Sequence, residues 1–309
     1  MRYTSQPSRW LPFVVLALLV SLPAAARAQG IFLTSAGAIN QSMGGAAVAA
    51  PLDSAGAMLW NSATISGLKS SEVSINLGLV LPTTTLQSSN VGISGSNTGE
   101  PGFTPVPTMA FVCKDACSPW TWGVGVFGIG GFSTNYAATA IGSPNQNPIN
   151  WPQPFGLGRI FTHAEIYQVT PTVSYALTDK LSIGGGANLD IAFVQADPLT
   201  LAPQNGGAIY GPGDGTRFAW GGGFQLGAYY ITDYNWRLGA SYKSTQWFEP
   251  LRFNSNDSLG QPVFREVAFD LPGVTSVGAA YDGFERWLYA IDVRWFETGD
   301  GRLVLRWES

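Results

Sequence analysis

Charged side chains and histidine are scarce in this 309-residue chain. Asp, Glu, Lys and Arg make up 12% of it, whereas about a quarter of a soluble domain is charged. His163 is the only histidine, so a catalytic or metal site that needs two or more histidines cannot form within the chain. A net charge of −4 is too small to indicate a nucleic-acid partner. We therefore expect no catalytic set, no metal site and no cofactor.

The first 28 residues have the layout of a secretory signal peptide. Arg2 and Arg9 supply the positive charge, Trp10–Leu22 is the apolar run, and Ala26–Ala28 is a small-x-small cleavage site. The run is shorter than the ~20 residues that a membrane-spanning helix needs. We expect the mature chain to begin near Gln29.

No second long apolar run follows Gln29, although Trp (11), Tyr (11), Phe (17) and Gly (38) are abundant. Few charges combined with many aromatic residues indicate a surface that faces lipid. In lipid, only helices and closed barrels satisfy the backbone hydrogen bonds, and spanning helices are excluded here. The sequence therefore predicts an all-β, transmembrane, antiparallel up-and-down β-barrel in the outer membrane of a Gram-negative bacterium, inserted by the barrel-assembly machinery.

Several segments alternate apolar and polar residues with period two, as barrel strands do. In Trp287–Trp295, for example, apolar residues occupy one face and Asp292 and Arg294 the other. We predict nine strands within residues 71–309: Val73–Thr85, Thr104–Val112, Trp120–Thr134, His163–Leu177, Leu181–Ala196, Phe218–Ile231, Trp236–Phe248, Val263–Tyr281 and Trp287–Phe296.

The connections between these strands alternate in length. Short turns lie near residues 114–116, 178–180, 232–235 and 282–285, and long polar loops occupy Leu86–Phe103, Asn135–Thr162, Asp197–Arg217 and Glu249–Pro262. Short periplasmic turns with long outer loops are typical of outer-membrane barrels, whereas a β-sandwich has no reason to separate its loops in this way.

Residues 29–70 do not alternate and are small and nearly uncharged. They are too apolar for a flexible tail, so we expect them to pack inside the barrel as a plug; a disordered leader is the alternative. Asn61 would then bond to the wall as the chain enters the first strand.

Two stretches of this segment resemble the N-terminal hatch of the FadL/TodX-type outer-membrane transporters: Gln41–Ala46 (QSMGGA) and Asp53–Ala63 (DSAGAMLWNSA). The likeness continues through Val73–Pro82, Trp120–Phe132 and Asp270–Tyr281. The family hatch ends in Asn-Pro-Ala, whereas this chain has serine in the middle position. The resemblance assigns the hatch motif to Gly44, Gly45, Asn61, Ser62 and Ala63.

The resemblance implies passive uptake of long-chain fatty acids or aromatic hydrocarbons. In the family, ligand is caught by the outer loops and leaves sideways where the third strand kinks. The third strand here contains FGIGGF at Phe127–Phe132, and glycines inside a strand mark bends and lost pairing. We expect the kink and exit at Gly128, Gly130 and Gly131; glycines packed against the plug are the other interpretation.

The chain departs from the family in its strand number. The family barrel has fourteen strands, whereas nine are predicted here, with a short tenth at Arg302–Trp307. An open sheet edge cannot stay in lipid, so we expect a truncated sequence; a ten-stranded barrel is the alternative.

Cys113 and Cys117 flank a short turn between paired strands. Disulfides form in the oxidising periplasm, and cross-strand neighbours have suitable separations. We predict a disulfide between them. A metal site would need more ligands than two thiols.

Three other functions are open to such a barrel. A hydrolase would gather a nucleophile, a base and an acid at one rim; Ser133, His163 and Asp197 lie near outer strand ends, which is weak evidence. A polar porin should have opposed charge rows, whereas these inner faces are mostly Ser, Thr, Asn and Gly. A structural or adhesive barrel is the third. We predict a channel for small hydrophobic molecules, with the substrate unspecified.

Overall fold

The computed structural model describes residues 32–200, 209–257, 259–284 and 286–297. All of them fall in one unit, Ile31–Ser309. The predicted signal peptide and the short strand at Arg302–Trp307 lie outside the described residues. In the part of the chain that the structure describes, no helix is both long and apolar enough to cross a membrane.

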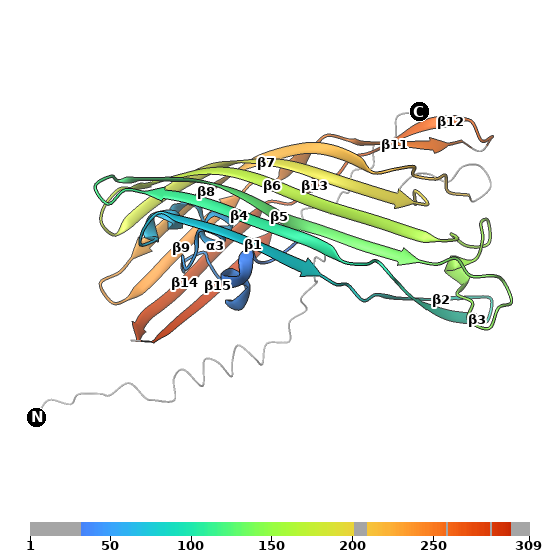
Figure 1. Cartoon of the computed structure of the whole chain (residues 1–309), viewed down its shortest axis with the longest axis horizontal. Helices are drawn as coiled ribbons and strands as arrows, with labels where there is room; N and C mark the ends of the chain where they lie inside the picture. The colour runs from blue at the N-terminus through green and yellow to red at the C-terminus, as the bar shows by residue number, and fades with distance from the viewer. Residues whose placement is uncertain (1–31, 201–208, 258, 285, 298–309) are drawn as a thin grey trace, which may run out of the picture. The chain divides into compact units, whose positions relative to one another are not determined.

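Residues 32–70, called the inner segment below, contain three short helices and precede the first strand (Figure 1). Almost all of the second half of this segment is buried. Many of its side chains are those of Ala, Ser and Gly, which lets its backbone approach the surrounding strands closely. The helices are α2 (Gly37–Ser42), α3 (Ser54–Trp60) and the 3-10 helix η1 (Ser62–Gly67).

Nine strands follow one another in an antiparallel path that curls around the inner segment (Figure 1). The nine strands keep their chain order along this path. Two hairpins and two short strands are inserted between them in the sequence. The path is β1 (Glu72–Val80), β4 (Thr104–Lys114), β5 (Trp120–Tyr136), β6 (Ile160–Ala176), β7 (Leu181–Asp197), β8 (Arg217–Ile231), β9 (Trp236–Lys243), β14 (Val274–Phe284) and β15 (Trp287–Phe296).

Burial along these strands is inverted relative to a soluble protein. On β1, the apolar Val73, Ile75 and Leu77 are exposed, while the polar residues between them are partly covered. On β6, Gln168 and Ser174 are buried, whereas Val169 and Val173 of the opposite face are exposed. Apolar residues outside and polar residues inside are the arrangement of a membrane barrel wall. The predicted alternation is confirmed on these strands.

Two of the predicted strands are interrupted. Trp236–Phe248 divides into β9 and β10 (Gln246–Phe248), because the hydroxyl of Ser244 accepts a hydrogen bond from Phe224 N and takes the place of a ladder partner. Val263–Tyr281 divides into β12 (Pro262–Val267), β13 (Asp270–Leu271) and β14. The second break falls at Pro272, which has no N–H to donate.

Two of the predicted loops contain β-hairpins that pair within themselves (Figure 1). Leu86–Phe103 contains most of β2 (Thr85–Asn90) and all of β3 (Ile93–Thr98), and Glu249–Pro262 contains β11 (Leu251–Asn256), which pairs with β12. Phe253 and Val267 of the second hairpin are buried against Phe248 and Leu199. The sequence assigned both segments to long polar loops, and the structure corrects this by showing paired strands in them.

Candidate functional site

The helix α3 begins at a buried carboxylate. Asp53 caps the helix: its Oδ1 accepts a hydrogen bond from Gly56 N at 3.2 Å. On the barrel side, Glu72 Oε1 accepts bonds from Ser54 N at 2.9 Å and from Ser54 Oγ at 3.0 Å. Burial, aided by the nearby Glu72 charge, raises the pKa of Asp53 from 3.8 to about 6. The start of α3 therefore carries a group that titrates close to neutrality.

Packing of the inner segment should weaken between pH 5 and pH 7.5. Because burial lifts the pKa of Asp53 from 3.8 to about 6, the folded chain holds this proton more tightly than the unfolded chain. The stabilisation is complete below pH 3.8 and is lost as the pH rises through 6. Hydrogen exchange of residues 32–70, corrected for intrinsic rates, should show more protection at pH 5.

Asp53→Asn tests this origin, since asparagine is an equally good helix cap but does not titrate. Its exchange protection should be the same at both pH values. A variant that keeps the parent's pH dependence would assign the effect to another group.

Asn61 joins the inner segment to the wall. Its Nδ2 donates to Val48 O at 2.8 Å and to Ala228 O of β8 at 3.0 Å, and its Oδ1 accepts from Ala63 N at 3.1 Å. The side chain is buried, so each of these bonds replaces a bond to water that burial has removed. The neighbouring turn is held by a second wall residue, since Ser174 Oγ donates to Ala63 O at 3.0 Å. Ser62 is also buried, and its Oγ has no partner within the described chain.

Glycines of the wall allow this close approach. A Cβ at Gly227 would lie 2.0 Å from Asn61 Oδ1, and one at Gly239 would lie 1.9 Å from Val48 O. A Cβ at Gly184 would lie 2.6 Å from Ala63 N. These separations are shorter than any side chain tolerates, so glycine in these strands is required by contact with the inner segment.

Two charged residues of β15 hold the other half of the inner segment. Asp292 Oδ2 accepts from Ala47 N at 2.8 Å and from Val48 N at 3.0 Å. Arg294 Nη2 donates to Gly45 O at 2.5 Å and to Asp292 Oδ2 at 3.0 Å. Gly44 and Gly45 both have positive φ angles, 64° and 87°, which let the chain turn toward these groups.

The Arg294 guanidinium also lies 3.7 Å from the centre of the Trp60 ring, and Lys243 Nζ of β9 lies 5.8 Å from it. Lys243 Nζ donates to Gln168 Oε1 at 3.0 Å, and Gln168 Nε2 donates to Asp190 Oδ1 at 2.7 Å. The inward charges of the wall are therefore used in a network around α3. Sequence reasoning placed Asp292 and Arg294 on the inner face but did not identify their partners.

The wall is interrupted between β4 and β5. Their pairing ends at Thr108 and Phe127. Beyond this point β4 continues along β1 as far as Thr104, and β5 continues along β6 as far as Tyr136. The register of β5 against β6 shifts between Gly128 and Gly130, so Ile129 is an extra residue. A bulge of this kind bends the strand.

The start of the inner segment lies at the same point. Phe32 forms an isolated bridge with Gly130, and Leu33 N donates to Ile129 O at 3.0 Å. A Cβ at Gly131 would lie 2.5 Å from Ala164 O, and one at Gly128 would lie 2.7 Å from Val106 Cγ1. The structure therefore places the three glycines at the bulge. The inner segment meets the strand at Gly130, whereas Gly128 faces Val106 of β4 and Gly131 faces Ala164 of β6.

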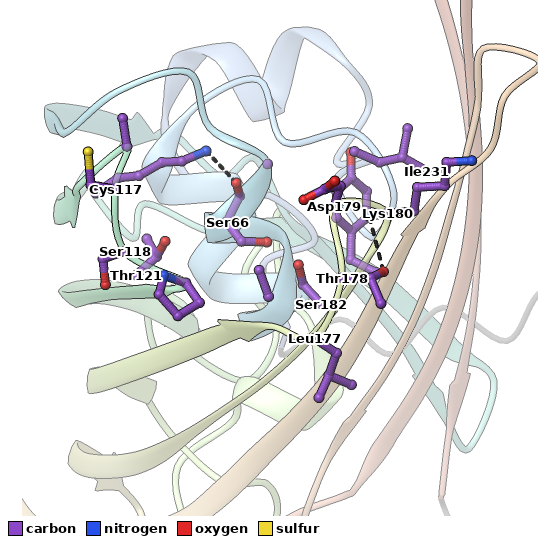
Figure 2. A pocket seen from close by; sticks show the side chains of 16 residues that line it. Ser66, Cys117, Ser118, Thr121, Leu177, Thr178, Asp179, Lys180, Ser182 and Ile231 are labelled. Atoms are coloured by element: carbon purple, nitrogen blue, oxygen red, sulfur yellow. Dashed lines mark hydrogen bonds between the residues drawn. The ribbon is translucent and has the colours of Figure 1, made fainter.

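A pocket of about 430 Å³ lies at the end of the wall that carries the short turns (Figure 2). Ser66 and Gly67, at the end of the inner segment, form one side, and the turns around Cys117 and Thr178–Lys180 form the others. Lys114 Nζ anchors this end by donating to Ser66 O and Leu68 O, each at 2.5 Å. The lining is mostly polar.

Cys113 and Cys117 are free thiols in the structure, so the predicted disulfide between them is not formed. Cys113 is paired with Trp122 across the hairpin, whereas Cys117 lies in the exposed turn. The prediction was wrong because the register places an aromatic residue, and not the second cysteine, opposite the first.

The residues weighed for a hydrolase are only partly brought together. His163 Nδ1 lies 3.3 Å from Ser133 Oγ, and its Nε2 lies 3.0 Å from Glu165 Oε1. Asp197 is paired with Phe161 and is not in this cluster. Among the residues that the structure describes, no group of three or more potential metal ligands is found.

Comparison with known proteins identifies the family. Residues 17–298 match the model of the outer membrane protein transport proteins (OMPP1/FadL/TodX). The chain belongs to this family. It is therefore an outer-membrane transport protein of a passive channel family and not an enzyme. The comparison with curated proteins gives no match.

Three solved structures show the same fold. The toluene transporter TodX of P. putida has a TM-score of 0.63 at 20% identity, covering 85% of this chain and 70% of its own. The toluene transporter TbuX of Ralstonia pickettii has a TM-score of 0.64 at 20% identity, and the match covers 85% of this chain and 72% of TbuX. A Pseudomonas aeruginosa FadL homologue has a TM-score of 0.64 at 13% identity, and the match covers 88% of this chain and 70% of the homologue. These solved structures are β-barrels with an N-terminal plug.

Proposed function

We propose that this FadL/TodX-family protein takes up small hydrophobic molecules passively, with the inner segment as a plug and a lateral exit between β4 and β5. The observation that carries the proposal is the end of β4–β5 pairing at Thr108 and Phe127, while each strand stays paired on its other side. Two neighbouring strands that separate in the wall provide a sideways route without leaving both edges of either strand unpaired.

The energetics of an apolar ligand favour this route. Moving apolar surface into water costs ~25 cal/mol per Å², whereas lipid tails replace the channel lining without that cost. The pocket below the inner segment is lined mainly by polar residues such as Ser66, Thr178 and Lys180, which suits water better than a hydrocarbon. Exit toward the bilayer is therefore favoured over exit toward the periplasm.

The beginning of the inner segment closes the exit in this proposal. Phe32 and Leu33 contact β5 at Gly130 and Ile129, so a ligand that leaves here displaces them. Displacing these two residues costs less free energy than moving the part of the segment that the hydrogen bonds of Asn61 and Asp292 hold.

The substrate class in this proposal is aromatic hydrocarbons or long-chain fatty acids. TodX and TbuX are toluene transporters, and the third structure is a FadL homologue. Uptake of labelled toluene and of a labelled long-chain fatty acid should be measured in cells with and without the gene. At least one of them should enter faster with the gene, while a labelled sugar should not. Equal uptake of both hydrophobic probes in the two strains would contradict the proposal.

A further inference from the structure

The wall contains a second interruption, at the outer end of β8. The strand pair β8–β10 ends with the register pair Phe248–Gly221 and a bond from Glu249 N to Trp220 O at 2.9 Å. The two segments of the chain meet again where Asp214 N donates to Asn254 O at 3.2 Å. Between these points, residues 216–218 and 250–252 are not paired with each other in the described structure, although Arg217 and Phe218 pair with β7 and residues 251–252 pair with β12. Pro250 has no N–H to offer.

A pocket of about 570 Å³ occupies this interruption, lined by Thr216, Arg217, Phe218, Glu249, Pro250 and Arg252. It lies at the end of the wall that carries the long connections, which is the outer side of such a barrel. None of the six lining residues belongs to β4, to β5 or to the inner segment. The proposed transport route does not use it.

The pocket lies at the level of the lipid head groups. Trp220 and Trp247 are more than half exposed on the outward face of β8 and β10, and outward aromatic side chains gather where the hydrocarbon ends. Phe218 is the next residue of that face toward the outside and lines the pocket. A molecule bound in the pocket would therefore have its polar part beside the arginines and its apolar part along these rings.

The polar groups of the pocket suit an anion. Arg252 is exposed and uses its Nε in an ion pair with Glu266 Oε1 at 2.5 Å. Arg217 donates from Nη2 to Asp214 O at 2.9 Å, while its buried Nε has no partner within the described chain. Guanidinium groups bind phosphate with two parallel hydrogen bonds. Glu249 is the one acidic residue among the six that line the pocket, and it opposes an anion.

We propose that this pocket binds the phosphate group of an outer-leaflet lipid, with the acyl chains lying along Phe218, Trp220 and Trp247. The arginines supply the attraction, the aromatic side chains supply the apolar platform, and the missing ladder pairing supplies the space. The lipid would cover the facing edges of residues 216–218 and 250–252, which do not pair with each other.

Binding of lipid A, a bisphosphorylated and acylated disaccharide, to the full-length protein in detergent micelles tests the proposal. Arg252→Gln should weaken binding roughly tenfold, the effect expected from losing a hydrogen bond between charged groups. Glu249→Gln should strengthen binding, because it removes the opposing charge. The matched control is Arg265→Gln, which makes the same charge change on the same hairpin; Arg265 is opposite Phe253 in the register and does not line the pocket.

Each remaining outcome overturns the assignment. Equal weakening by Arg252→Gln and Arg265→Gln would indicate general charge attraction. Equal binding of the dephosphorylated lipid would indicate that the rings alone hold the acyl chains. Inorganic phosphate that binds as tightly as the lipid would indicate a site for a free anion.

Discussion

Gly128→Val should abolish most uptake of hydrophobic substrate while the amount of folded protein in the outer membrane stays unchanged. A Cβ at Gly128 would lie 2.7 Å from Val106 Cγ1 of β4, so a valine fills the space between β4 and β5 just beyond their last register pair. The obstructing atom is the end of a side chain, and overpacking of this kind costs ~1–3 kcal/mol, which a barrel tolerates. Uptake of labelled toluene and labelled fatty acid, at matched surface abundance, measures the effect.

Gly185→Val is the matched control. Gly185 is paired with Val173 of β6 and Leu226 of β8, and a Cβ there would meet Leu226 Cδ2 at 3.4 Å. It should transport normally. Valine at Gly131 is a poorer test, since its Cβ would lie 2.5 Å from the Ala164 carbonyl oxygen and would disturb folding. If Gly128→Val transports as well as the parent protein, the exit lies elsewhere.

Asp292→Ala should make the channel permeable to small polar solutes. One carboxylate oxygen, Asp292 Oδ2, accepts from Ala47 N and Val48 N and pairs with Arg294. Hydrogen bonds to charged groups contribute roughly 1.5–3 kcal/mol each, so their loss frees this half of the inner segment by several kcal/mol. Deletion of residues 30–66 should have a larger effect. The entry of small sugars into liposomes carrying each variant is the measurement.

Asp282→Ala separates release of the inner segment from general damage to the wall. Asp282 forms an ion pair with Arg237 near a short turn of the same sheet, and its N–H donates to Asn235 O at 3.1 Å, so these contacts lie within the wall. This variant should remain as tight as the parent. Heat-modifiable mobility in electrophoresis would verify that each barrel is folded. If neither Asp292→Ala nor the deletion admits sugars faster, the inner segment is not a plug.

The amino-acid sequence by itself determined which residues of the wall face outward and which face inward. Strands such as Ile160–Ala176 and Trp287–Phe296 were located within a few residues because side chains alternate across a strand whatever its partner is. The aromatic and aliphatic residues of one face must meet lipid, and this constraint is local. The family followed from the short motifs of the inner segment, and the family model bears it out.

Only the tertiary structure decided which residues meet. The bonds of Asn61 to Ala228 and of Asp292 to Val48 join residues 167 and 244 positions apart, and alternation within one strand carries no information about register with another. The same limit explains the wrong disulfide, since the register of β4 against β5 places Trp122 opposite Cys113 and leaves Cys117 in the turn. The end of pairing at Phe127 and the hairpin β11–β12 likewise depend on what the neighbouring chain does, so no single segment could reveal them.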